Sequence, residues 1–179
     1  MSLSPEQAAE ALREIEATRQ RSHELGVYRQ GGPILLIWGV IWIVGYGLTA
    51  VSPGYTSIVW LALTVMGAIA GWLISPSGGN PGQNFRYVTS WVVFLLLLGG
   101  SWAILTPQTA SQRAALAALL VAAGYAFAGI WWWQRYLWLG LALFAVTLFG
   151  FFFAPWFELW MAAMGGGGLI LGGLWLRAA

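Results

Sequence analysis

The sequence predicts an all-α polytopic membrane protein, with six transmembrane helices arranged as three hairpin repeats and a polar helix ahead of them. Of its 179 residues, 59% are hydrophobic and only 8% are charged, whereas a soluble domain usually carries about 25% charged residues. Six stretches are apolar over roughly the 20 residues that a helix needs to cross hydrocarbon. Segments rich in proline, glycine and polar residues separate them, as expected for turns.

Residues 1–30 are expected to form a separate unit, a cytoplasmic amphipathic helix. Ser4 can cap this helix, Pro5 suits its first position, and Gln7 completes a capping box. Gly26 is expected to end it, and apolar residues recur near one of its faces. Three roles are open for it: a solvated helix next to the membrane, a helix docked on the membrane surface, or a contact for a protein partner through residues 4–25.

Residues 31–179 are expected to form the six-helix transmembrane domain. The first span is not read as a cleavable signal peptide, because a long polar segment precedes it and five more spans follow. The predicted spans are 33–51, 57–74, 87–105, 114–132, 136–153 and 156–176.

The arginines predict the orientation of the chain in the membrane. With six spans, one side carries all of them except Arg113, and the positive-inside rule makes that side cytoplasmic. Both termini are therefore expected in the cytoplasm, with the chain in a bacterial inner membrane. The arginines on the cytoplasmic side are Arg13, Arg19, Arg21, Arg29, Arg86, Arg135 and Arg177.

The spans also show an internal pattern of three consecutive two-helix hairpins. The stretches "RYVTSWVVFLLLLGGSWAILTP" and "RYLWLGLALFAVTLFGFFFAP" both begin with Arg-Tyr and end at a proline, and the first span likewise ends at Pro53. A second span with spaced small residues follows each proline. Repeats of this kind are common in membrane proteins; the alternative is that apolar spans rich in glycine and tryptophan resemble one another by composition.

Small residues in the second span of each hairpin are expected at tight helix interfaces, because they let two backbones approach closely in a membrane. The expected packing pairs are Gly67 with Gly71, Gly124 with Ala128, and Gly168 with Gly172. The run "GGGG" at 165–168 is expected to pack in the same way. Its alternative is a broken helix of the kind found at transporter midplanes.

The stretch "GIWWWQRYLW" lies between the fourth and fifth spans and is expected to form an interfacial belt. Tryptophan and tyrosine rings favour the headgroup level, where one end of the ring is apolar and the other is wet, and an arginine there faces the lipid phosphates. The alternative is an aromatic cage for a cationic ligand. The belt residues are Trp131, Trp132, Trp133, Arg135 and Tyr136.

Candidates for chemistry are few. The chain has no Cys, Asp or Lys, and its only histidine, His23, cannot by itself build a metal site or a catalytic triad. Glu158 is the only acid beyond the N-terminal segment. Acids in membrane spans are functional by default, but Glu158 follows Pro155 at the outer end of the last span, where it is expected to reach water, which favours a structural role over a functional one. Arg113 is expected on the same outer side, so an Arg113–Glu158 pair is predicted.

Hydroxyl groups within the spans are expected to bond to carbonyls of their own helices, which makes them poor nucleophiles without a neighbouring base. Thr49, Ser90 and Thr147 belong to this group. No catalytic residue, cofactor or metal ion is predicted.

The plan of the spans resembles the HdeD-like acid-resistance membrane proteins, which have six spans built from two-helix repeats. The residues that carry the resemblance are Pro53, Pro107 and Pro155 with their flanking glycines, across residues 33–176. The resemblance implies an inner-membrane, stress-related protein without a known catalytic set.

The function expected from the sequence is that of a non-enzymatic integral inner-membrane protein with a structural, sensory or accessory role, stress-related or as a subunit of a complex. The expected partners are the lipid bilayer, a protein partner and a second copy of the chain. Nucleic acid is not expected, because the arginines are scattered. The alternative is a small oligomeric channel or transporter for a small solute, with Glu158 at its outer mouth.

Overall fold

The computed structural model describes residues 5–74, 81–131 and 133–178, and for residues 5–9, 11, 12, 17–25, 27, 29, 30 and 81–84 the description covers the backbone alone. Ser4 and Trp132 therefore lie outside the described residues. All of the regular structure described is helical. The elements are α1 (Pro5–Val51), η1 (Pro53–Tyr55), α2 (Thr56–Ile74), α3 (Pro81–Leu105), α4 (Ala110–Trp131), α5 (Gln134–Phe153), α6 (Phe157–Trp160), the π-helical segment η2 (Met161–Gly166) and α7 (Gly167–Arg177).

Six helical stretches within the described residues are long and apolar enough to cross a membrane. Each contains 20 to 22 residues, which at 1.5 Å per residue matches a hydrocarbon core of about 30 Å. The sixth stretch, Phe157–Arg177, comprises α6, η2 and α7. The prediction of six apolar helices is confirmed, and the chain is consistent with a multi-pass membrane protein.

Helix α1 differs from the prediction because it is one continuous helix of 47 residues. Gly26 does not end it, and Pro33 lies inside it. Proline removes one intrahelical hydrogen bond, here to the carbonyl of Arg29. That carbonyl lies two residues before the apolar span, which begins at Gly31. Close contacts of Gly31 with the Tyr136 hydroxyl and of Gly32 with the Gly173 carbonyl hold the helix at this point.

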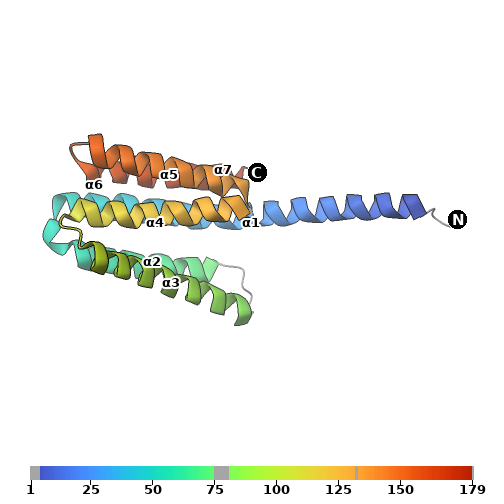
Figure 1. Ribbon diagram of the computed structural model, residues 1–179, viewed down its shortest axis with the longest axis horizontal. Coiled ribbons are helices and arrows are strands. Elements are labelled where there is room, and N and C mark those ends of the chain that lie inside the picture. The colour runs from blue at the N-terminus through green and yellow to red at the C-terminus, as the bar shows by residue number, and fades with distance from the viewer. Residues whose placement is uncertain (1–4, 75–80, 132, 179) are drawn as a thin grey trace.

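The helices form a bundle from which the first part of α1 projects (Figure 1). Within the bundle α1 lies between α2 on one side and α7 on the other. We call the end where α1 enters the bundle the extension end; α2, α4 and α7 end there, and α3 and α5 begin there. The other end, which carries η1 and the α3–α4 and α5–α6 turns, is the opposite end. The C-terminus lies at the extension end, beside α1.

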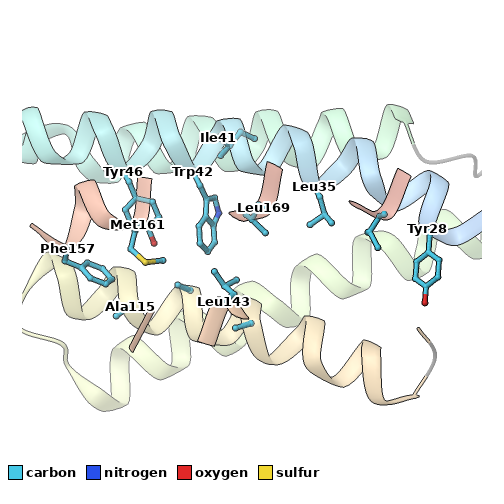
Figure 2. Packing of buried hydrophobic residues seen from close by; sticks show 13 residues of the cluster. Tyr28, Leu35, Ile41, Trp42, Tyr46, Ala115, Leu143, Phe157, Met161 and Leu169 are labelled. Atoms are coloured by element: carbon cyan, nitrogen blue, oxygen red, sulfur yellow. The ribbon is translucent and has the colours of Figure 1, made fainter. Parts of the chain in front are cut away.

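The buried apolar side chains fill the space between α1, α4, α5 and the sixth span. Trp42, Leu143, Met161 and Leu169 approach one another at its centre (Figure 2). Helix α2 adds no fully buried large side chain to this core, although Trp60 and Leu63 pack against it half-buried, and no described residue of the α3 span is buried. The full set is Tyr28, Leu35, Ile41, Trp42, Tyr46, Ala115, Ala118, Ala122, Leu143, Phe157, Met161, Leu169 and Leu176.

The closest helix contacts are made through glycine, at two seams. At the α1–α7 seam, a Cβ placed on Gly32 would lie 2.9 Å from the Gly173 carbonyl oxygen. Seven residues, or about two turns, further along α1, a Cβ on Gly39 would lie 2.8 Å from the carbonyl oxygen of Gly166 in η2. Both contacts are reciprocal, because a Cβ on Gly173 would approach the Gly32 carbonyl oxygen and a Cβ on Gly166 would approach that of Gly39. The two glycines are seven residues apart on each helix, so the two contacts lie along one line between the antiparallel helices. Only glycine permits this approach of two backbones.

The second seam joins α4 and α5. A Cβ on Gly140 would lie 2.5 Å from the Ala126 amide nitrogen and 2.7 Å from the Ala122 carbonyl oxygen, and Gly129 packs directly on Leu137. Both seams join helices of different predicted hairpins. The tight interfaces therefore cross the hairpin pattern, and the threefold repeat itself stays a prediction.

The glycines predicted to pack divide into two groups. Gly67, Gly71 and Gly172 are buried against side chains of α1, α3 and α5, respectively. Gly124 and Gly168 are exposed, and a Cβ on either would meet no other atom within 4 Å. Their helix faces point away from the core, so their lack of a side chain has no packing role in this chain.

Ala128 is only partly buried, and the "GGGG" run is likewise split. Gly165 and Gly166 pack against Trp42 and Gly39, whereas nothing lies within 4 Å of a Cβ on Gly167 or Gly168. The backbone is not broken here, because η2 continues directly into α7.

Candidate functional site

A polar cluster lies at the opposite end, around Glu158 in the first turn of α6. The Ser111 hydroxyl donates a hydrogen bond of 2.7 Å to Oε1 of Glu158, which joins the start of α4 to the start of the sixth span. Because the carboxylate is partly buried and its partner is a hydroxyl, this contact fixes the rotamer of Glu158 without neutralising its charge.

The predicted Arg113–Glu158 ion pair is not formed among the described residues. Arg113 is exposed, and its Nη1 donates to the Pro107 carbonyl oxygen at 3.2 Å. Ser111 and Arg113 are two positions apart on α4, which places them about 200° apart around the helix. The face of α4 that turns Ser111 towards α6 therefore turns Arg113 towards the surroundings.

A capping box positions this first turn of α4. The Gln112 amide nitrogen donates to Oγ1 of Thr109 at 3.1 Å, and the Thr109 amide nitrogen donates to Oε1 of Gln112 at 3.1 Å. This reciprocal pair satisfies two helix N-terminal donors. The sequence "TASQ" carries the signal for this capping box, whereas the only capping box predicted from the sequence is that of the N-terminal helix.

Beneath Glu158 the bundle is closed by apolar and aromatic side chains. Phe157 and Met161 are buried, and the Tyr46 hydroxyl directs a long hydrogen bond of 3.5 Å to the Ala114 carbonyl oxygen. The Trp160 indole donates to the Val146 carbonyl oxygen at 2.9 Å. The polar atoms of these rings are thus paired locally, and they do not form a continuous polar path into the core.

The hydroxyl groups within the spans behave differently from one another. Thr49 donates to the Gly45 carbonyl oxygen at 2.8 Å and accepts from the Trp60 indole at 3.1 Å, and Ser90 donates to the Arg86 carbonyl oxygen. Thr147 does not follow this pattern. It is fully buried, and its Oγ1 has no hydrogen-bond partner within the described part of the chain.

A second cluster lies at the extension end, around Arg135 in the first turn of α5. Its guanidinium carbon lies 5.2 Å from the centre of the Tyr28 ring and 5.0 Å from the centre of the Trp175 ring. Nη1 donates to the Trp175 carbonyl oxygen at 2.9 Å. We call Tyr28, Arg135 and Trp175 the arginine clamp; it joins α1, α5 and α7.

The aromatic rings next to the clamp extend it into the bundle. Tyr136 stacks on Tyr28 at 6.3 Å between ring centres and contacts Tyr125 at 5.9 Å and Trp133 at 6.0 Å. Trp131 points outward and is 73% exposed. Of the predicted belt, the outward placement thus holds for Trp131, whereas Trp133 and Tyr136 pack inward.

The alternative of an aromatic cage for a cation takes an unexpected form. The rings that enclose a cation belong to Tyr28 and Trp175, and the cation is Arg135 of the chain itself. The sequence does not indicate that these two rings meet Arg135, because they lie 107 and 40 residues from it and no local pattern links them.

No group of three or more metal-ligating side chains of His, Cys, Asp or Glu occurs within the described residues. Comparisons with protein families, with curated proteins and with solved structures found no match for this chain.

Proposed function

We propose that this chain is a non-enzymatic integral membrane protein with a structural, sensory or accessory role, and that its extension end faces the cytoplasm of a bacterial cell. The observation that carries the proposal is the closed interior of the bundle. Fully buried Leu35, Met161 and Leu176 occupy its length, and the two glycine seams bring the backbones of α1 and α7, and of α4 and α5, into contact. A bundle with a core filled in this way can serve as a stable scaffold and can be recognised by a partner, and we expect its function to rest on these two properties.

The extension supports an accessory role. At 1.5 Å per residue, residues 5–25 add about 32 Å of helix before α1 reaches Tyr28, and no other helix lies beside the part of α1 that projects from the bundle (Figure 1). Ile15 is 64% exposed there, among the exposed charged residues Glu10, Arg13 and Glu16. A free helix of this kind offers a partner protein an apolar contact within a charged surface.

The orientation rests on the distribution of charge. Arg86, Arg135 and Arg177 lie at helix termini of the extension end, whereas Arg113 lies at the opposite end together with Glu158. This asymmetry favours a cytoplasmic extension end under the positive-inside rule. The resemblance to HdeD-like proteins favours a stress-related role within this class.

A site-specific crosslinking experiment tests the accessory role in the native membrane. A photo-reactive residue at Ile15 is expected to give one discrete protein adduct. The same residue at Ile104, which is 83% exposed but lies in the α3 span, is the matched control and is expected to label lipid instead. Adducts from the two positions that do not differ would contradict the role assigned to the extension.

The alternative function is that of a small oligomeric channel or transporter. The partly buried carboxylate of Glu158 favours it, as does the π-helical segment η2 just beyond, since π-helical turns are frequent at functional sites. Solute flux into proteoliposomes distinguishes the two functions. We expect the same background flux for the parent protein, Glu158→Gln and the control Arg113→Gln. Robust transport that Glu158→Gln abolishes and Arg113→Gln preserves would replace our proposal with the alternative.

A further inference from the structure

We propose that the arginine clamp is a preformed binding site for the phosphate of an anionic phospholipid headgroup. The inference does not depend on the proposed function, because a structural protein and a transporter would both use such a site in the same way.

The first argument is the fixed position of the guanidinium. The Tyr28 and Trp175 rings lie within 5.2 Å of its carbon, and the Trp175 carbonyl holds Nη1. The Arg135 backbone nitrogen also approaches the Tyr28 hydroxyl, at 3.5 Å. An arginine side chain normally loses about 2 kcal/mol of rotamer freedom when it is immobilised. Here the fold has already fixed it, so a ligand does not bear this cost.

The second argument is the number of donors that remain. A guanidinium has five N–H donors in a planar fork that matches the oxygens of a phosphate. Within the described part of the chain, one of its hydrogen bonds is to Trp175 and no other is formed. Because Arg135 is only partly buried, the remaining donors can reach a ligand at the edge of the bundle.

The third argument is the charge around the clamp. The aliphatic part of the Arg177 side chain packs on Gly32 of α1, and Arg177 is exposed. Both residues belong to helices that form the clamp. Glu24 is the acid nearest to Tyr28 in the sequence and precedes it by four residues, about 6 Å of helix. Against this one acid, residues 17–30 carry three arginines, Arg19, Arg21 and Arg29, so the net charge of the segment is positive. The field at the clamp is therefore positive.

The fourth argument is depth, and it selects a lipid over a soluble anion. Arg135 is the second residue of the fifth span, and α1 and α7 also cross the span boundary at the clamp. This level corresponds to the headgroups, where lipid phosphates are the most concentrated anions. The exposed Trp131 ring at the same end is typical of that level. Basic sites between transmembrane helices at the headgroup level bind anionic headgroups.

Thermal unfolding of the full chain in a neutral detergent tests the proposal, with lipid added in steps. Dioleoylphosphatidylglycerol is expected to raise the Tm of the parent protein, and dioleoylphosphatidylcholine is not. In Arg135→Gln the apparent affinity for phosphatidylglycerol is expected to fall at least about fivefold, in line with the loss of one arginine contact. Arg113→Gln, which removes an exposed arginine at the opposite end, is expected to keep the parent affinity.

The conservative variant Arg135→Lys separates charge from geometry. Lysine keeps the charge but lacks the planar fork, so its affinity is expected to fall between those of the parent and Arg135→Gln. If Arg135→Gln does not fold, Arg135→Lys decides, and parent affinity in that variant overturns the proposal. The proposal is also overturned if Arg135→Gln keeps the parent affinity, or if phosphatidylcholine acts like phosphatidylglycerol. A Tm rise of the same size with millimolar inorganic phosphate would assign the site to a free anion in place of a lipid.

Discussion

The glycine seam between α1 and α7 gives the sharpest test of the packing. A Cβ on Gly39 would lie 2.8 Å from the Gly166 carbonyl oxygen and 3.0 Å from the Ile170 amide nitrogen. Both are backbone atoms, so no side-chain rotation can relieve the contact and the helices must separate. A Cβ on Gly47, two turns further along the same helix, would meet no other atom within 4 Å.

Alanine at these two positions isolates the contact energy. Replacing glycine by alanine in a helix interior gains up to about 1 kcal/mol of intrinsic helix stability, and this gain is common to both variants. Overpacking a well-filled interface costs about 1–3 kcal/mol. Gly39→Ala is therefore expected to be less stable than Gly47→Ala by about 2 kcal/mol, and Gly47→Ala is expected to equal or exceed the parent protein.

The assay is reversible unfolding in mixed micelles with increasing denaturing detergent, followed by tryptophan fluorescence. Trp42, which packs against Gly165 beside this seam, is one of the 13 tryptophans that contribute to this global signal. The free energies of unfolding of the two variants are compared at the same detergent composition. Equal values would refute the argument, because they would show that α1 and α7 do not approach closely enough for a Cβ to matter.

Two further predictions concern single side chains. Thr147→Val replaces the fully buried, unpartnered hydroxyl by a methyl group of similar shape, so the free energy of unfolding is expected to stay unchanged or to rise by about 1 kcal/mol; a loss of more than about 1 kcal/mol in the same unfolding assay would show that the hydroxyl has a partner. Thr109→Ala removes one half of the capping box with Gln112 and is expected to cost about 1 kcal/mol, whereas Thr56→Ala, at an exposed bond to the Pro53 carbonyl, is its control and is expected to cost less.

The sequence is sufficient to predict the six apolar helices, but not which helices pack against one another. Hydrophobic length identifies a span from local composition, which is why all six were found. The continuity of α1 through Gly26 and Pro33 was missed, because turn residues in a sequence cannot show the contacts that hold a helix together. Those contacts are made by Tyr136 and Gly173, more than 100 residues away.

Of the glycines predicted to pack, Gly67, Gly71 and Gly172 are buried against other helices, whereas Gly124 and Gly168 are exposed. The reason for this difference is a related one. Small residues spaced four apart indicate that close approach is possible, but not which face of the helix meets another helix. Gly124 satisfies the pattern and is exposed, whereas Gly140 does not belong to it and lies against the α4 backbone. The relevant spacing is shared between two helices, as in the matched seven-residue intervals of Gly32 with Gly39 and Gly166 with Gly173.

The same long-range logic links the extension to the bundle. Tyr28 lies three residues before the first span, yet its ring packs on both Arg135 and Tyr136. Because α1 is one continuous helix, a partner that tilts the extension would also apply a force to the α1–α7 seam and to the clamp. The covering of Tyr28 by two side chains of α5 resists that tilt. A sensory or accessory role therefore does not require a conformational change within the bundle. A force applied to the extension would be transmitted to α5 and α7 at the clamp.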